Sequence, residues 1–360
     1  MLTGTGRQEV LTAAHEGSDH AEQAEQHDIG EATLEQLRAD LARLSRQADT
    51  GEPLPVFGDM RRVRDRIHRM LDRRLWPRER TDLYLVLGCV SGLMGVTASR
   101  LGHPETAEEL IRTGWAYANA LDHKPLRGVL RAKLSGIQYW RGRFGESRDL
   151  AADGLRYVSQ GPLGATLHLS LARASARFGD PDAAGQAVDA AHDAREREYS
   201  DDLLAIGGEE FALSLATHHC LAGAALAEII GSERRAEEEL EHARNRYDAG
   251  PAAGEQHWSG GEPFAGICLA MIRLRSGGLD PAAAALEPAL SLPPARRVTP
   301  LTTLLARVRE ELTAPIFRGS AQARDLGDQI EEFAREAIAA SQPEGWNHRR
   351  SCLWARQAGD

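Results

Sequence analysis

The feature of the sequence that most restricts its fold is a spacing of small residues that occurs in five copies, of which the last is incomplete. In each copy a glycine, called here the anchor glycine, is followed five residues later by one small residue and twelve residues later by another. The copies are Gly102, Ala107 and Gly114; Gly142, Ser147 and Gly154; Gly179, Ala184 and Ala191; Gly231, Ala236 and Ala243; and Gly278 with Ala283, where Leu290 replaces the last small residue.

Paired helices explain this spacing. A glycine at the C-terminus of a helix readily adopts the left-handed backbone that turns the chain. The two small residues are seven positions apart, so they lie on one face of the following helix and let a partner helix approach closely. Four of the five residues that lie seven positions before the anchor glycines are also small, namely Gly95, Ser135, Ala172 and Ala224, with Met271 in the fifth copy.

A helix-turn-helix unit that recurs in this way predicts an all-α fold, an α-solenoid of about five tetratricopeptide-like hairpins. The anchor glycines are 40, 37, 52 and 47 residues apart, so the units exceed the ideal of about 34 residues and carry insertions. We expect a polar segment over 1–30, a helical pair over 31–79, the solenoid over 80–292, capping helices over 293–341 and a tail over 342–360.

Two insertions stand out, at residues 195–214 and in the Gly- and Pro-rich loop 248–266. Insertions in solenoids often lie at the binding edge. Trp258 and Phe264 in the second insertion are expected to pack either on the solenoid or on a ligand.

Composition restricts the class of protein. The formal net charge of −10 does not favour indiscriminate binding to nucleic acid. No apolar run follows a basic start, and no stretch of 18 apolar residues occurs, so we expect neither a secretion signal nor a membrane span. The four cysteines, Cys89, Cys220, Cys268 and Cys352, form no CxxC pair and are interpreted as buried, reduced thiols of a cytoplasmic protein.

The sequence contains no G-x-S-x-G, P-loop or H-E-x-x-H motif, so we expect no enzyme, no cofactor and no metal site. The histidines of the N-terminal segment, His15, His20 and His27, match no metal-ligand spacing. His218 and His219, followed by Cys220, come closest to a site. Neighbouring helical residues point about 100° apart, however, so they would not chelate one metal unaided.

A binding groove is the more natural kind of site for a solenoid, because the first helix of each unit lines the concave surface. Aromatic and charged side chains on that surface suit a peptide, a small charged ligand or a partner protein, although the same side chains could instead pack or pair with neighbours. Counting back from the anchor glycines places there Tyr139, Trp140, Arg173, Arg177, His218, Glu228 and Arg275.

A second candidate surface is the predicted helix over 57–76. Its apolar side carries Met60, Val63, Ile67, Met70 and Leu71, and its polar side is strongly basic. Such a helix can contact nucleic acid or an acidic partner, or it can be a solvated face that pairs with Asp59, Asp65 and Asp72. The candidate contact residues are Arg61, Arg62, Arg66, Arg69 and Arg73.

The repeats, together with LTAAHEGSDHAEQAEQHDIGEATLEQLRADLARLS, RGRFGESRDLAADGLRYVSQGP, THHCLAGAALAEI and APIFRGSAQARDLGDQIEEF, resemble the C-terminal part of actinobacterial XRE-type transcriptional regulators. In that family a helix-turn-helix DNA-binding domain precedes a tetratricopeptide-like sensor domain. The resemblance implies ligand or peptide sensing coupled to transcription. The sequence departs from the family in lacking the helix-turn-helix module at its start, so direct binding to DNA is not expected from the family pattern.

Three functions remain open at this point. The leading hypothesis is a cytoplasmic sensor that binds a peptide, small molecule or partner protein in the groove and regulates transcription. The alternative is an interaction scaffold or homodimer without a small ligand. The third is an enzyme that uses His218 and Glu228 in the groove, although no nucleophile, base and orienting group can be placed together from sequence.

Overall fold

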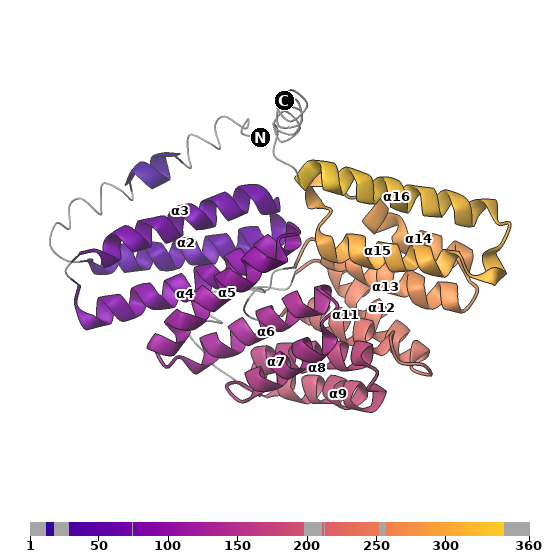
Figure 1. Ribbon diagram of the computed structural model, residues 1–360, viewed down its shortest axis with the longest axis horizontal. Helices are drawn as coiled ribbons and strands as arrows, with labels where there is room; N and C mark the ends of the chain where they lie inside the picture. Colours follow the sequence, from indigo (N-terminus) through magenta and orange to yellow (C-terminus); the bar gives the residue numbers. More distant parts are fainter. Residues whose placement is uncertain are drawn as a thin grey trace, which may run out of the picture.

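The computed structural model describes residues 12–17, 29–73, 75–197, 211, 213–251 and 257–341, with only the backbone described for 338–341. Every regular element in these ranges is helical. The helices pack as adjacent antiparallel pairs, so the fold is the all-α solenoid of helical hairpins that the sequence predicts. Figure 1 shows the chain running from α2–α5 on one side, through α6–α9, to α13–α16 on the other.

The α-helices are α2 (Glu31–Thr50), α3 (Pro53–Leu71), α4 (Pro77–Arg100), α5 (Pro104–Ala120), α6 (Lys124–Trp140), α7 (Phe144–Leu155), α8 (Gly161–Phe178), α9 (Pro181–Glu196), α11 (Leu215–Leu226), α12 (Glu233–Ala249), α13 (Gly261–Arg275), α14 (Leu279–Leu290), α15 (Thr299–Leu312) and α16 (Ala321–Ser341). Two short 3₁₀ helices, η2 (Pro294–Arg296) and η3 (Pro315–Phe317), flank α15.

The five repeat units correspond to five hairpins, α4/α5, α6/α7, α8/α9, α11/α12 and α13/α14. The first helices of the units contact one another in succession, α4 to α6, α6 to α8, α8 to α11 and α11 to α13, and α13 then contacts α15. These helices form one continuous inner layer, and each second helix covers its own partner from outside. This layering decides which side chains can reach a shared inner space.

The anchor glycines make the turns for which they were predicted, with one change of register. Gly102, Gly142, Gly179 and Gly231 have φ of +85°, +74°, +93° and +87°, and the second helix of each unit begins two residues later. In the fifth unit the left-handed residue is Gly277, at φ +81°, whereas Gly278 has φ −86°. The prediction of Gly278 was therefore wrong by one position, because two glycines are adjacent there.

Reading the fifth unit from Gly277 also corrects its small residues. The positions five and twelve residues later are Ala282 and Ala289, and both are fully buried. The proposed interruption at Leu290 disappears, so all five units follow one pattern.

The small residues allow close helix crossing. In the α6/α7 hairpin, Ser135 donates a 2.8 Å hydrogen bond from Oγ to the backbone O of Ser147, and Ser147 Oγ donates one of the same length to Ser135 O. A Cβ added at Gly266 in α13 would lie 2.3 Å from the backbone O of Ala285 in α14. At this distance no larger residue fits without a shift of backbone, which explains why the spacing of small residues is so regular.

The C-terminal pair α15/α16 repeats the turn but not the small residues. Gly319 has φ +88°, and α16 begins two residues later. Larger side chains, Leu326, Ile330 and Phe333, are buried along α16. This pair covers α13 and α14, in agreement with the predicted capping role.

Two hydrophobic cores hold the solenoid together, and they meet within α8. The first contains side chains from α2 to the start of α8, including Leu163. The second begins at Leu169 and continues to α16. Helix α4 is long and apolar enough to cross a membrane by length and composition, but 72% of its most apolar window is buried within the protein, as in an ordinary core helix.

Segments from the two ends of the solenoid meet. Thr299, the first residue of α15, donates a 3.1 Å hydrogen bond from Oγ1 to the backbone O of Arg100, the last residue of α4. The backbone N of Ser259, which precedes α13, donates a 2.9 Å hydrogen bond to the O of Asp49 in α2. These two bonds join the first helices of the chain to the last ones around the inner layer.

Candidate functional site

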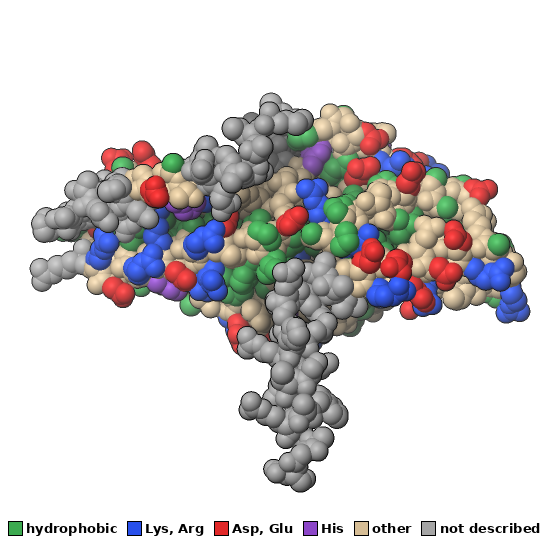
Figure 2. Space-filling model, turned by 90° about the horizontal axis from the view of Figure 1, so that it is seen from above, with side chains coloured by type: hydrophobic (Ala, Val, Ile, Leu, Met, Phe, Trp, Pro, Cys, Tyr) green, Lys and Arg blue, Asp and Glu red, His purple; other side chains and the backbone are tan. Residues whose placement is uncertain are grey.

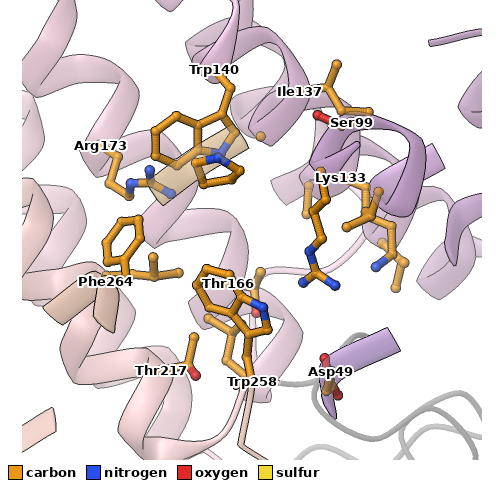
Figure 3. A pocket seen from close by; sticks show the side chains of 18 of the residues that line it. Asp49, Ser99, Lys133, Ile137, Trp140, Thr166, Arg173, Thr217, Trp258 and Phe264 are labelled. Atoms are coloured by element: carbon orange, nitrogen blue, oxygen red, sulfur yellow. The ribbon is translucent and has the colours of Figure 1, made fainter. Parts of the chain in front are cut away.

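A cavity of about 220 Å³ lies where the two cores meet. Its walls come from the first helices of the units, α4, α6, α8, α11 and α13. Asp49 of α2, Pro300 of α15 and three residues of connecting segments, Phe211, Leu213 and Trp258, complete the lining. Because each of these helices starts a different repeat unit, residues from the whole length of the solenoid surround one space (Figure 3).

One wall of the cavity is aromatic. Trp140 and Phe264 meet edge to face with ring centroids 6.1 Å apart, and Trp258 lies 6.1 Å from Phe264 on its other side. Aliphatic side chains, among them Ile137 and Leu163, continue this apolar surface. Such a surface can bury the apolar body of a small molecule.

Arg173 of α8 projects into the aromatic wall (Figure 3). Its Cζ lies 4.2 Å from the centre of the Tyr139 ring, 5.1 Å from that of Trp140 and 5.6 Å from that of Phe264. These are cation–π distances, which stabilise a cation by about 0.5–2 kcal/mol each. The buried Nε atom has no hydrogen-bond partner among the described residues.

Two more cations line the cavity. Lys133 is buried, with Nζ 5.2 Å from the centre of the Phe211 ring. Arg100 donates a 2.8 Å hydrogen bond from Nη1 to the backbone O of Ala48, and its Cζ lies 5.4 Å from the Trp258 ring. Asp49 contributes a carboxylate. Among the described residues the lining therefore holds three formal positive charges and one negative charge.

Only two of the seven predicted groove residues, Trp140 and Arg173, line the cavity. Tyr139 lies behind them, buried beneath the Arg173 guanidinium. Arg177, one turn further along α8, lies with its Cζ 4.6 Å from the centre of the Phe144 ring and outside the cavity.

Glu228 and Arg275 lie outside the cavity and tie helices together. Glu228 accepts two hydrogen bonds from Arg307 of α15, at 2.6 and 2.8 Å. Arg275 donates to Glu311 Oε1 at 2.8 Å and to the backbone O of Ala227 at 2.7 Å. Both residues thus join α15 to the preceding units, which satisfies their charges within the protein.

His218 lies in a cluster on the outer side of α11, away from the cavity. Its Nε2 is 3.0 Å from Nδ1 of His192 in α9. His192 Nε2 lies 3.2 Å from Oε1 of Glu239 in α12, whose Oε2 lies 2.7 Å from His219 Nδ1. His218 thus contacts His192, whereas Glu228 is paired with Arg307, so the two residues of the enzyme hypothesis have different partners.

The cluster shifts the pKa values of its members in opposite directions. Burial, with Arg195 next in importance, lowers the pKa of His218 to about 3. The hydrogen bond to Glu239 raises the pKa of His192. Burial acts to raise the pKa of Glu239, but hydrogen bonds from His192 and His219 outweigh it and lower that pKa to about 2. Neutral His218 and ionised Glu239 therefore define the cluster at neutral pH.

Several cavity residues escaped prediction, for different reasons. The predicted groove positions lie 13, 10, 6, 3 and 2 residues before an anchor glycine. Val96, Ser99 and Arg100 occupy three of these positions before Gly102 and line the cavity, but the prediction named no residue of that unit. Lys133 lies nine residues before Gly142 and so falls outside these positions. Asp49 precedes the repeats, and no pattern in the sequence relates it to them.

The predicted basic helix is α3. Its apolar side is buried as expected, including Met60, Val63 and Ile67. On the polar side Arg62 pairs with Asp59, and Arg66 lies 3.6 Å from Asp40. Arg61, Arg69 and Arg73 are exposed. On the face in Figure 2 acidic and basic side chains are interspersed.

Cys89, Cys220 and Cys268 are buried, and Cys352 lies outside the described residues, as do His20 and His27. Burial raises the pKa of Cys268 to about 12, so its thiol stays protonated. Within the described ranges, no group of three or more His, Cys, Asp or Glu side chains has the arrangement of a metal site.

No protein-family model matches the chain, and no curated protein sequence matches it either. The resemblance to the sensor region of XRE-type regulators therefore stays a hypothesis.

Proposed function

We propose that the protein is a cytoplasmic ligand sensor of transcriptional regulation, and that it binds a small molecule in the cavity between its two cores. The observation that carries this proposal is the lining of one 220 Å³ cavity by helices from every part of the solenoid. A ligand at that place contacts both cores at once. Its binding energy then depends on how the two halves of the solenoid are oriented.

The ends of the solenoid give this coupling a physical route. The cavity-lining residues Arg100 and Trp258 also belong to the contacts that join the first helices to the last. A ligand that packs against Trp258 therefore favours the closed arrangement over any more open one. Binding that differs between two arrangements shifts their populations, and a change in outer shape can alter a partner interface. The step to transcription is supported by the family resemblance.

A cavity-filling variant tests the binding part of the proposal. Gly136 of α6 lines the cavity, and a Cβ added there meets no atom within 4 Å. Gly136→Phe should therefore fill the cavity without disturbing the fold. The matched control is Gly185→Phe in α9, where an added Cβ is equally free of neighbours but lies outside the cavity.

The measurement is the fluorescence of N-phenyl-1-naphthylamine, a neutral aromatic probe that brightens in apolar surroundings. Wild type and Gly185→Phe should bind it, and Gly136→Phe should bind it at least about tenfold more weakly. Equal binding by all three proteins would place the probe elsewhere and contradict the proposal. Native mass spectrometry of protein from its own cells, with Gly136→Phe as reference, would show whether a natural ligand occupies the cavity.

The regulatory part needs a separate readout. Transcript levels should differ between cells that produce wild type and cells that produce Gly136→Phe in equal amounts, while Gly185→Phe cells should match wild type. Identical transcript profiles would leave a binding protein without a role in transcription. A tight dimer that carries no ligand would instead favour the scaffold hypothesis.

A further inference from the structure

Resting on the function proposed above, we infer that the natural ligand is an amphipathic anion whose acidic group pairs with Arg173 and whose apolar body lies against Trp140, Phe264 and Trp258. The argument begins with Arg173. A guanidinium carries five N–H donors, whereas the three rings around it offer only π faces to the cation. Ring faces offset part of the cost of burying the charge, but they do not supply the in-plane acceptors that a guanidinium fork prefers.

Arg173 also differs from comparable arginines of the inner layer. Arg307 makes a bidentate pair with Glu228, and Arg275 pairs with Glu311. No Asp or Glu among the described residues lies within ion-pair distance of Arg173, and its buried Nε lacks an acceptor there. The rings hold the guanidinium in place at the cavity wall. Its Nε is buried, so the Nη groups of this half-buried side chain are the donors that meet a group entering the cavity.

The lining around Arg173 points to the same class of ligand. Lys133, Arg100 and the carboxylate of Asp49 also line the cavity. Arg173 is the cation of the aromatic wall, and an acidic group on the ligand would pair with its guanidinium. The aromatic wall beside Arg173 is apolar (Figure 3), so the same ligand must also have an apolar part. A carboxylate, sulfonate or phosphate on an aromatic or aliphatic body satisfies both demands.

The test compares two ligands of the same shape. 1-Naphthoate and 1-naphthamide share one ring system and differ in the charge of the head group. Each is titrated against N-phenyl-1-naphthylamine bound to the wild-type protein. The naphthoate should displace the probe at about tenfold lower concentration than the amide, the size expected of a charge-assisted hydrogen bond pair in a cavity.

Variants then locate the anion. Arg173→Gln should remove the preference for naphthoate and leave naphthamide binding within about threefold. Arg173→Lys, which keeps the charge but not the planar fork, should retain part of the preference. Arg177→Gln is the matched control, since Arg177 lies on the same helix over the Phe144 ring and outside the cavity, and it should behave as wild type.

The outcomes separate the two proposals. Equal displacement by naphthoate and naphthamide in the wild type would overturn the inference even if the glutamine variant did not fold. A preference for naphthoate that survives in folded Arg173→Gln would overturn the role of Arg173. In both cases probe binding that Gly136→Phe abolishes would leave the proposed function intact. Failure of the probe to bind the cavity of the wild type would instead remove the proposed function itself.

Discussion

Thr299 Oγ1 and the backbone O of Arg100 are joined by a 3.1 Å hydrogen bond across 199 residues of sequence. The bond connects the N-terminus of α15 to the C-terminus of α4, the first inner helix of the repeats. A superhelix that was open at both ends would bring no such pair together. The contact therefore marks the place where the solenoid closes around its cavity.

The first prediction concerns this closure. Thr299→Val keeps the shape of the side chain and removes the hydroxyl, so it should lower the free energy of unfolding by about 1 kcal/mol. It should also speed hydrogen exchange at the end of α4 and the start of α15. Thr302→Val is the control, because Thr302 Oγ1 bonds only to the backbone O of Thr299 within α15. If both variants gave the same exchange pattern, the hydrogen bond between Thr299 and Arg100 would not stabilise the contact between α4 and α15.

The second prediction concerns helix crossing. Gly266→Ala places a methyl group 2.3 Å from the backbone O of Ala285, so α13 and α14 must separate. We expect a loss of about 1–3 kcal/mol in the free energy of unfolding, measured by urea denaturation. Gly185→Ala in α9 has open space around its Cβ and should instead gain up to about 1 kcal/mol from helix propensity. Tolerance of Gly266→Ala would mean that the crossing is looser than the structure shows.

The third prediction tests the corrected register of the fifth unit. Gly277→Ala forces an L-residue into the left-handed region at φ +81° and should cost about 1–2 kcal/mol. Gly278→Ala, at φ −86°, should change stability by no more than about 0.5 kcal/mol. Melting temperatures of the two variants show which glycine makes the left-handed turn. A larger loss of stability for Gly278→Ala would support Gly278 as the turn residue and contradict the corrected register.

The fourth prediction is a pH dependence from the histidine cluster. The pKa of His218 is about 3 in the folded protein against about 6.5 when unfolded. The unfolded state therefore takes up the proton first, and stability falls as pH drops below 6.5. From pH 7 to pH 5 the loss from this group should be about 2 kcal/mol.

The other members of the cluster modify this curve. The raised pKa of His192 adds stability that is present below pH 6.5 and is lost as pH rises through its folded pKa. The lowered pKa of Glu239 adds stability above about pH 4.5 that disappears as pH falls toward 2. This contribution is present at both pH 7 and pH 5, so it hardly changes between them.

Urea denaturation at pH 7 and pH 5 measures the effect. His218→Gln should remove most of the loss between the two values, because the amide does not titrate. The exposed His103, which lies outside the cluster, provides the control as His103→Gln. A wild-type protein equally stable at both pH values would show that His192 cancels His218 or that His218 is not held neutral.

What the sequence by itself determined is local in origin. The turn between two paired helices requires a glycine with a left-handed backbone, and a close helix crossing requires a small residue. Both requirements come from neighbouring helices, so they produce a regular spacing in the sequence. The helices, their pairing, the apolar side of α3 and the capping pair α15/α16 were predictable for this reason. Even the misplacement at Gly278 shifted the fifth unit by one residue and left the fold unchanged.

Only the tertiary structure decided the candidate site. How far each unit rotates against the next depends on the packing of whole inner faces, and this rotation closes the superhelix so that Asp49, Arg173 and Trp258 line one cavity. The same packing places His218 against His192 and pairs Glu228 with Arg307. Arg100 and Arg177 both lie two residues before an anchor glycine, yet Arg100 lines the cavity and Arg177 lies over the Phe144 ring outside it. Position along a curved inner layer is a property of the whole chain.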